Sequence, residues 1–123
     1  MTLYFYQELS SQLDLLHQIA SSLTKSGLHE RAGELYEKSR SYQEAMESYR
    51  NGGAFRKAID LARSAYPSEV VTLEGQWGDK LCSMKRYDAA IVHFIEAGEV
   101  VKAIEAAING RQWGKAAQIV DVV

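Results

Sequence analysis

Histidine and cysteine side chains are the first candidates for chemistry in this chain, and there are only four of them. His17, His29 and His93 lie too far apart in the sequence for the i, i+4 pair of a helical metal site, and no second type of ligand clusters with them. Cys82 follows Leu81 in an apolar helical stretch, where a cysteine is more often a small core residue than a nucleophile. We therefore predict no catalytic, cofactor-binding or metal-binding residue.

A glycine-rich segment suggests a different chemistry, because backbone amides that precede a helix can cradle a phosphate. Asn51, Gly52 and Gly53 precede a predicted helix, but they also end another one, and glycine after asparagine is ordinary for a helix C-cap and turn. The sequence contains no Walker loop, no Gly-x-Gly-x-x-Gly fingerprint and no Gly-x-Ser-x-Gly elbow. We interpret the segment as a turn and expect no small-molecule substrate.

Seven tyrosines and two tryptophans would suit a stacking platform for nucleic-acid bases. Such a platform needs basic neighbours, whereas 14 basic and 16 acidic residues give this chain a net charge of −2. No segment is strongly basic, so we expect no nucleic-acid partner. The two basic pairs, Arg56-Lys57 and Lys85-Arg86, lie beside acidic residues at predicted helix starts and are interpreted as solvated surface.

Length and composition describe an ordinary globular chain. Its 123 residues are 46% apolar and 24% charged, which excludes disordered, collagenous and fibrous classes. The longest uncharged stretch, residues 15–24, is too short and too polar to cross a bilayer, so we expect neither a transmembrane helix nor a signal peptide. The single cysteine cannot form an internal disulfide, which fits a reducing compartment such as the cytosol.

Alanine spacing is the most informative feature of the sequence. Two triplets of alanine recur every thirteen residues, and a longer insert separates the triplets. They are Ala32, Ala45 and Ala58, then Ala90, Ala103 and Ala116. Most have a large residue three positions before, an apolar residue just after and another four after, which places all four side chains on one stripe of an α-helix. The alanine methyl group lets two helices approach closely at their crossing.

The same frame assigns most aromatic residues to the core. Four tyrosines fall on the packing stripes, so we expect them to be buried rather than to stack on a ligand. These are Tyr36, Tyr42, Tyr49 and Tyr87. His29 occupies the aromatic position of the weakest copy, where a packing role is expected, and His93 is expected to lie exposed beside the stripe of Phe94.

A thirteen-residue repeat holds about three helical turns and a tight connection. Eight helices are predicted, and no stretch alternates with the period of a strand. The helices span residues 3–25, 28–39, 42–50, 54–66, 68–84, 87–97, 100–109 and 112–121. Because helices this short must bury their stripes on neighbours, the pattern predicts an all-α fold. We expect an α-solenoid of helical hairpins in which residues 1–123 form a single repeat segment.

Glycine is expected to end several of these helices, because it adopts the left-handed conformation of a C-cap without strain. Four glycines stand at the predicted helix ends: Gly27, Gly52, Gly98 and Gly110. We therefore predict a left-handed backbone at these four positions.

The repeats resemble tetratricopeptide repeats. In that family a small and a large residue on one helix precede a large residue, an alanine, an aromatic residue and an alanine on the next. The matching residues here are Gly78, Leu81, Tyr87, Ala90, Phe94 and Ala97, and earlier Gly33, Tyr36, Tyr42, Ala45, Tyr49 and Gly52. The spacing is tighter than half a standard repeat and the closing proline is missing, which resembles the solenoids of coat and transport-train proteins more than co-chaperones.

Two longer strings carry a closer resemblance. Residues 49–77 and residues 103–116 are similar to the large solenoid subunits of intraflagellar transport trains. The resemblance implies a fragment of a solenoid that follows amino-terminal propellers in a peripheral subunit of the ciliary B complex. It further implies a non-enzymatic interaction scaffold for cilium assembly and cargo transport, located in the cilium and basal body on the cytoplasmic side. Its implied partners are other intraflagellar transport subunits.

Both ends of the chain are apolar, whereas a natural solenoid ends in repeats with a polar outer face. Residues 3–6 and residues 118–123 carry these apolar stretches. We therefore expect a fragment with cut ends that self-associates through them, and contact with a membrane stays an open question.

Other classes of function stay open from the sequence. The same repeats would suit a subunit of a vesicle coat or of the ciliary A complex. An enzyme would need two or more convergent polar groups in one pocket. A co-chaperone clamp for acidic peptide tails would need Lys or Arg at fixed groove positions, which are mostly Glu, Ser, Leu or Gln here.

Overall fold

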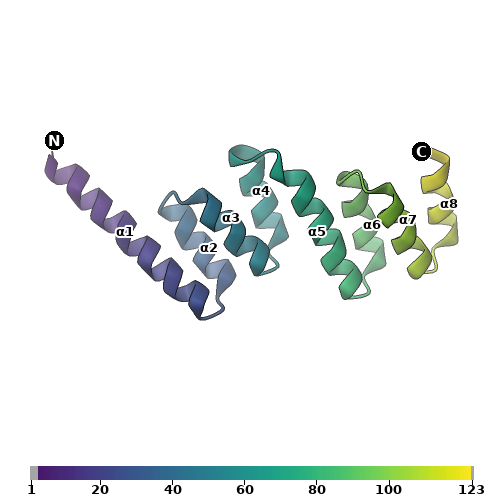
Figure 1. The fold of residues 1–123 in the computed structure, drawn as a ribbon, viewed down its shortest axis with the longest axis horizontal. Coiled ribbons are helices and arrows are strands. Elements are labelled where there is room, and N and C mark those ends of the chain that lie inside the picture. Colours follow the sequence, from purple (N-terminus) through teal and green to yellow (C-terminus); the bar gives the residue numbers. More distant parts are fainter. Residues whose placement is uncertain (1–2, 123) are drawn as a thin grey trace. The chain divides into compact units, whose positions relative to one another are not determined.

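The computed structural model describes residues 3–122, with side chains from residue 6 onward. This part of the chain contains eight α-helices and no strand, as the sequence predicts (Figure 1). Their bounds are α1 Leu3–Lys25, α2 His29–Lys38, α3 Tyr42–Asn51, α4 Phe55–Ala65, α5 Glu69–Ser83, α6 Tyr87–Glu96, α7 Val100–Asn109 and α8 Trp113–Val122. Each bound lies within one residue of its prediction. None of the described helices combines the length and apolarity that crossing a membrane requires.

The chain divides into two compact units, Met1–Ala65 and Tyr66–Val123. The first unit holds α1 to α4 and the second holds α5 to α8. Within each unit the helices form an antiparallel row, in which each helix packs on its neighbours in the sequence (Figure 1). This nearest-neighbour packing of helical hairpins is the arrangement of an α-solenoid, so the predicted fold class is confirmed.

One turn geometry explains the thirteen-residue spacing. After six of the helices one residue is left-handed, and the amide of the next residue donates to the carbonyl five residues earlier at 2.8–2.9 Å. At one such turn Lys85 has a φ of 61°, and Arg86 N donates to Leu81 O at 2.8 Å. This Schellman closure leaves three residues between successive helices. Most of the helices have ten residues, so one helix and one turn together give the spacing of thirteen. The left-handed residues are Gly27, Arg40, Gly53, Lys85, Gly98 and Arg111.

The predicted left-handed backbone is confirmed at two of the four glycines and wrong at Gly52 and Gly110. These two have right-handed φ values of −86° and −85°, because the left-handed residue follows one position later. Close packing explains why they are glycines. A Cβ on Gly52 would lie 2.9 Å from the Cβ of His29, and one on Gly110 would lie 2.9 Å from the Cβ of Tyr87.

The repeat alanines form the centre of each core, as predicted. Five of the six are 0% exposed and Ala116 is 9% exposed. The aromatic rings four residues after two of these alanines, Tyr49 and Phe94, are each 2% exposed. A Cβ on Gly33 would lie 2.6 Å from the ring of Tyr49, and one on Gly78 would lie 2.6 Å from the ring of Phe94. Glycine at these two positions therefore lets the facing helix bring its aromatic ring against the backbone.

Four residues of the packing stripes are exposed, which corrects their prediction: Tyr42, Trp113, Ala117 and Val120. Tyr42 is 41% exposed, Trp113 is 62% exposed and Val120 is 56% exposed. Tyr42 and Trp113 are the first residues of α3 and α8, so a tight turn rather than a helix flanks them. Among the described helices α8 packs chiefly on α7, which leaves its other sides uncovered, and Ile119 takes the buried position instead.

The predicted apolar ends are described only in part. The side chains of residues 3–5 and the whole of residue 123 lie outside the described residues. Tyr6 is 67% exposed and Val122 is 85% exposed. That the ends self-associate stays a prediction.

The two units repeat one another at an interval of 45 residues. Aligning α2 to α4 with α5 to α7 places Gly33 on Gly78 and Tyr49 on Phe94, and the close glycine–ring contact recurs at both places. The left-handed turns after α2 and after α3 fall on those after α5 and after α6. The interval therefore defines equivalent positions whose chemistry can be compared directly.

Candidate functional site

Two of the three histidines make packing contacts within the first unit. The ring of His17 meets that of Tyr36 edge-on, with centroids 5.2 Å apart. His29 lies against Gly52, in keeping with its expected packing role. No group of three His, Cys, Asp or Glu side chains that could hold a metal ion occurs within residues 3–122.

His93 is only 18% exposed, so the prediction that it lies free on the surface is wrong. Its Nδ1 atom lies 2.7 Å from Oε2 of Glu74, and its ring stacks on Trp77 with centroids 3.8 Å apart. The residue faces α5, and the carboxylate of Glu74, itself 10% exposed, gives the imidazole the polar partner that burial requires. Stacking covers one face of the ring, which makes this pair a structural link between α5 and α6.

Cys82 is half-buried on α5. Burial raises the pKa of its thiol, and the nearby carboxylate of Asp79 raises that pKa further. A nucleophilic cysteine needs the opposite environment, one that lowers the pKa and favours the thiolate. Both influences disfavour the thiolate, so this environment differs from that of an activated cysteine.

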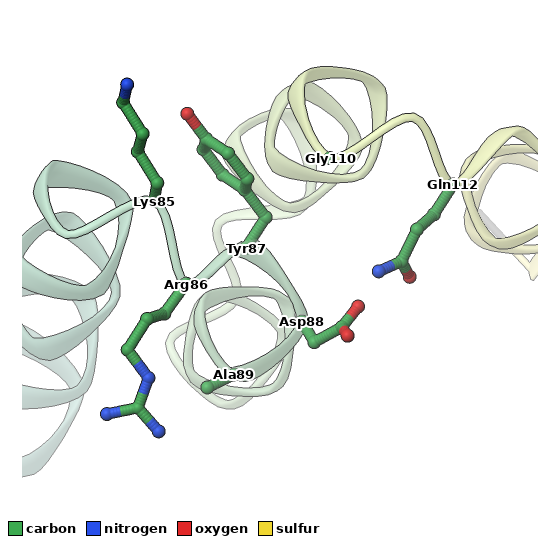
Figure 2. Close-up of a pocket in the computed structure, with 7 residues that line it drawn as sticks. All are labelled: Lys85, Arg86, Tyr87, Asp88, Ala89, Gly110 and Gln112. Carbon is green, nitrogen blue, oxygen red and sulfur yellow. The ribbon is translucent and has the colours of Figure 1, made fainter.

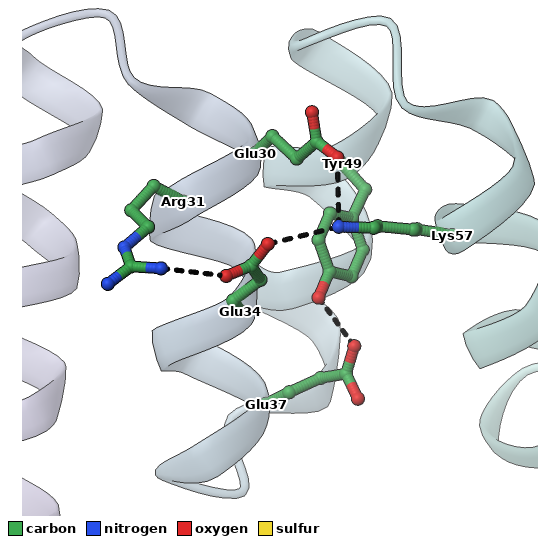
Figure 3. Close-up of polar contacts among 6 residues, drawn as sticks. All are labelled: Glu30, Arg31, Glu34, Glu37, Tyr49 and Lys57. Atoms are coloured by element: carbon green, nitrogen blue, oxygen red, sulfur yellow. Dashed lines mark hydrogen bonds and ion pairs between the residues drawn. The ribbon is translucent and has the colours of Figure 1, made fainter.

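A charged cluster joins α2 and α4 on the surface of the first unit (Figure 3). The ammonium of Lys57 lies 2.8 Å from Glu30 and 3.0 Å from Glu34, and Arg31 lies 3.3 Å from Glu34. The ammonium also lies 5.8 Å from the ring centroid of Tyr49. Hydrogen bonds to the two glutamates raise the pKa of Lys57, and the bond from Lys57 lowers the pKa of Glu34.

The hydroxyl of Tyr49 forms the second part of this cluster. It donates to Oε1 of Glu37 at 2.6 Å (Figure 3). Burial raises the pKa of Tyr49 well above its ordinary value, and the hydrogen bond to the carboxylate adds to the increase. The buried ring is therefore tied to the surface at its polar end.

The second unit repeats the lysine contacts. The ammonium of Lys102 lies 3.3 Å from Asp79 and 5.8 Å from the ring centroid of Phe94. Each of these residues stands 45 positions after its counterpart in the first unit. Phe94 has no hydroxyl to donate, and Cys82 stands where the first unit has Glu37, so the donor and its acceptor change together.

Lys57 lies on the surface, at 45% exposure, as the sequence predicts, but its contacts with α2 were not predicted, and Lys102 was not singled out from the sequence. A signal was present, because each lysine directly precedes a repeat alanine, Ala58 or Ala103. Each also follows its acidic partner by 23 residues. The pairing spans two helices that are not sequence neighbours, which periodicity along one helix does not reveal.

A polar depression of about 400 Å³ lies between the turns that precede α6 and α8. Figure 2 shows Lys85 and the hydroxyl of Tyr87 pointing to one side, Asp88 and Gln112 facing each other, and Arg86 pointing away. The side chains do not converge on one point, so they form neither an acid–base pair nor an anion clamp. The polar contacts of Lys57, Lys102 and His93 each join one helix to another.

Known proteins similar to this chain are intraflagellar transport proteins. It is 54% identical over 115 residues, 94% of the chain, to the intraflagellar transport protein 172 homolog of Danio rerio. It is 58% identical over 109 residues, 89% of the chain, to intraflagellar transport protein 172 of Chlamydomonas reinhardtii, and 52% identical over 116 residues, 94% of the chain, to the Homo sapiens homolog. The chain spans 6–7% of the length of these relatives. No family model matches it.

Proposed function

We propose that this chain, which is homologous to a segment of intraflagellar transport protein 172, is a protein-interaction segment of a ciliary transport subunit. The observation that carries the proposal is its identity of 52–58% to those proteins over about nine-tenths of the chain. Its partners are other intraflagellar transport subunits, in particular those of the B complex. It acts in cilium assembly and cargo transport, in the cilium and at the basal body, on the cytoplasmic side.

The contacts of the chemically capable residues support a scaffold rather than an enzyme. Burial and Asp79 raise the pKa of the Cys82 thiol, and His93 is stacked on Trp77 and bonded to Glu74. Buried alanines and aromatic rings hold each row of helices together, while the outer faces stay available. Function then resides in an extended surface, and the chain performs no catalysis.

The two units belong to one repeat segment of a longer solenoid. Their equivalence at an interval of 45 residues supports this, because both use the same turn and the same glycine–ring contact. The small share of its relatives that the chain spans supports a piece of a longer row. Such rows bind partners over several successive helices.

Retention of purified subunits on the immobilised chain tests the proposed function. Each purified B-complex subunit is offered separately, with A-complex subunits as the comparison and circular dichroism as the control for folding. The chain used carries Leu9→Glu, which is expected to prevent association between its own copies and leaves the exposed aliphatic face of α6 intact. An Ala90→Leu variant, whose helix packing is disturbed, controls for adhesion of unfolded chain.

We expect at least one B-complex subunit to be retained by the folded chain and released by the variant with disturbed packing. A helical chain that retains no B-complex subunit, or that retains only A-complex subunits, would contradict the proposal.

A further inference from the structure

An apolar groove of about 500 Å³ lies between α6 and α8 in the second unit. Its lining residues are Ile91, Val92, Ile95, Lys115, Gln118, Ile119, Asp121 and Val122. Three of the aliphatic side chains are open to solvent: Val92 is 55% exposed, Ile95 is 49% exposed and Val122 is 85% exposed. Contiguous exposed aliphatic groups around a hollow are characteristic of a docking surface.

The fold itself does not require this face to be apolar. The positions 45 residues before Val92 and Ile95 are Glu47 and Arg50, on the equivalent helix α3 of the first unit. There the two side chains form an ion pair with each other. The same place in the same helical frame is therefore polar in one unit and apolar in the other, which points to a contact that only the second unit makes.

Helices of the same row do not cover the groove. Each helix packs on its sequence neighbours, and α7 joins α6 and α8 from one side. A helix added after α8 in the same manner would pack on α8 and leave the space between α6 and α8 open. The occupant is therefore a segment that approaches from outside the row.

The N-terminal half of α1 is such a segment. Its apolar stripe consists of Leu9, Leu13, Leu16, Ala20 and Leu23. Helix α2 has 10 residues against 23 in α1, and it covers the second half of the stripe, where Ala20 is 0% exposed. Residues 6–12 are all exposed. At 1.5 Å per residue the exposed residues 6–12 measure about 10 Å, which fits within the roughly 15 Å length of α6 or α8.

The charges of α1 and of the groove are also complementary, and they indicate in which direction α1 lies in the groove. Glu8 and Asp14 are the only acidic or basic residues of α1 before His17, so the uncovered half of the helix is anionic. Lys115 lines the groove, and no ion pair to it is formed among the described residues. Asp121 lies more than one turn further along α8, so the acidic side of α1 is expected at the end of the groove that carries Lys115.

We propose that the N-terminal half of α1 from a second copy of this chain docks in the groove between α6 and α8. The stripe that begins at Leu9 then covers Val92, Ile95 and Val122. The two surfaces differ, so the contact is head-to-tail and each added copy leaves one helix and one groove free. Association is open-ended and increases with concentration. This inference does not depend on the proposed function, because it concerns only copies of this chain.

Sedimentation velocity of the whole chain, from micromolar to millimolar concentration, tests the contact. The groove variant carries Val92→Glu and Ile95→Glu, and the helix variant carries Leu9→Glu. Val101→Glu and Leu15→Glu serve as matched controls, because both side chains are apolar and exposed, at 68% and 56%, but lie outside the groove and off the stripe. Circular dichroism establishes that every variant is folded.

We expect the wild-type mass to rise beyond that of a dimer, each interface variant to be monomeric alone, and both controls to behave as wild type. An equimolar mixture of the groove and helix variants should form a one-to-one dimer and nothing larger, because it contains one intact groove for each intact helix. A monomeric wild-type chain, a mixture that stays monomeric, or controls that lose association equally would each overturn the proposal.

Discussion

At the residue scale, the six left-handed turn positions share one backbone geometry, but the conformational cost of adopting it differs among them. Three carry glycine, which accepts this backbone without cost, and the other three carry Arg40, Lys85 and Arg111. A side chain in this conformation costs roughly 1–2 kcal/mol relative to the right-handed one. The basic residues therefore strain their turns, and the neighbouring helices hold the strained geometry in place.

Replacing Lys85 by glycine should stabilise the chain. We expect Lys85→Gly to raise the free energy of unfolding by about 0.5–1 kcal/mol, because the relief of strain exceeds the added entropy of the unfolded chain. Gly98→Ala is the matched reverse change thirteen residues later, where a Cβ would meet nothing within 4 Å, and it should cost about 1 kcal/mol. Urea unfolding measures both, and a destabilised Lys85→Gly would contradict the strained turn.

Tyr49→Phe tests the hydroxyl that joins the first core to its surface. Near neutral pH the loss of the bond to Glu37 should lower the free energy of unfolding by about 1 kcal/mol. The folded pKa of Tyr49 is raised above its ordinary value of 10.0, so its stabilising contribution is complete below pH 10 and is lost as the unfolded state ionises above it. Unfolding measured from pH 8 to pH 11 should therefore show the difference between wild type and variant shrinking above pH 10. A difference that stays constant would contradict the protonated, buried hydroxyl.

Burial that follows from the periodicity along one helix could be predicted, whereas contacts that depend on a particular side chain of another helix could not. The repeat alanines follow from periodicity alone, and all six are buried. His93 needed Glu74 and Trp77 to be buried, and both reach it from α5. The ion pairs of Lys57, which stays exposed, likewise depend on Glu30 and Glu34 of another helix, α2.

At the element scale, the length of each helix follows from its turn. Helix ends could be predicted to within one residue because the stripe and the Schellman turn both repeat every thirteen residues. The left-handed residue itself could not be located at Arg40, Lys85 and Arg111, because basic residues have no preference for that conformation. Gly52 and Gly110 are required by close packing at a helix end, and in the sequence such a glycine cannot be told from a C-cap glycine.

Ala90→Leu tests whether the alanines stand at helix crossings. Ala90 is 0% exposed at the centre of the α5, α6 and α7 core, so the larger side chain should force the helices apart and cost about 1–3 kcal/mol. Ala117→Leu is the matched control, because Ala117 is exposed on α8 and the change should alter stability by less than about 0.5 kcal/mol. Thermal unfolding followed by circular dichroism compares them. Equal melting temperatures for Ala90→Leu and wild type would show that the crossing does not depend on alanine.

At the scale of the whole molecule, the two units share one pattern of packing contacts and differ in their surfaces. The glycine–ring contact, the turn and the lysine–carboxylate pair recur at an interval of 45 residues. The outer face of α3 carries the Glu47–Arg50 ion pair, whereas that of α6 is aliphatic. Repeated residues therefore maintain the fold, and the differences between units are where binding specificity is expected.

The prediction of a single repeat segment has a direct optical test. Both tryptophans, Trp77 and Trp113, lie in the second unit, so fluorescence reports on that unit while circular dichroism reports on all helices. If residues 1–123 unfold as one cooperative segment, the two signals should give coincident urea transitions. Separate transitions would show two independent units and contradict the single segment.

The central claim is that an extended helical surface, rather than a discrete site, carries the function. Hydrogen–deuterium exchange of the chain, with and without the complete set of purified B-complex subunits, tests it most directly. We predict slower exchange across two or more neighbouring helices of a unit when the subunits are present. Unchanged exchange throughout the chain, or protection confined to the depression between Lys85 and Gln112, would contradict the claim.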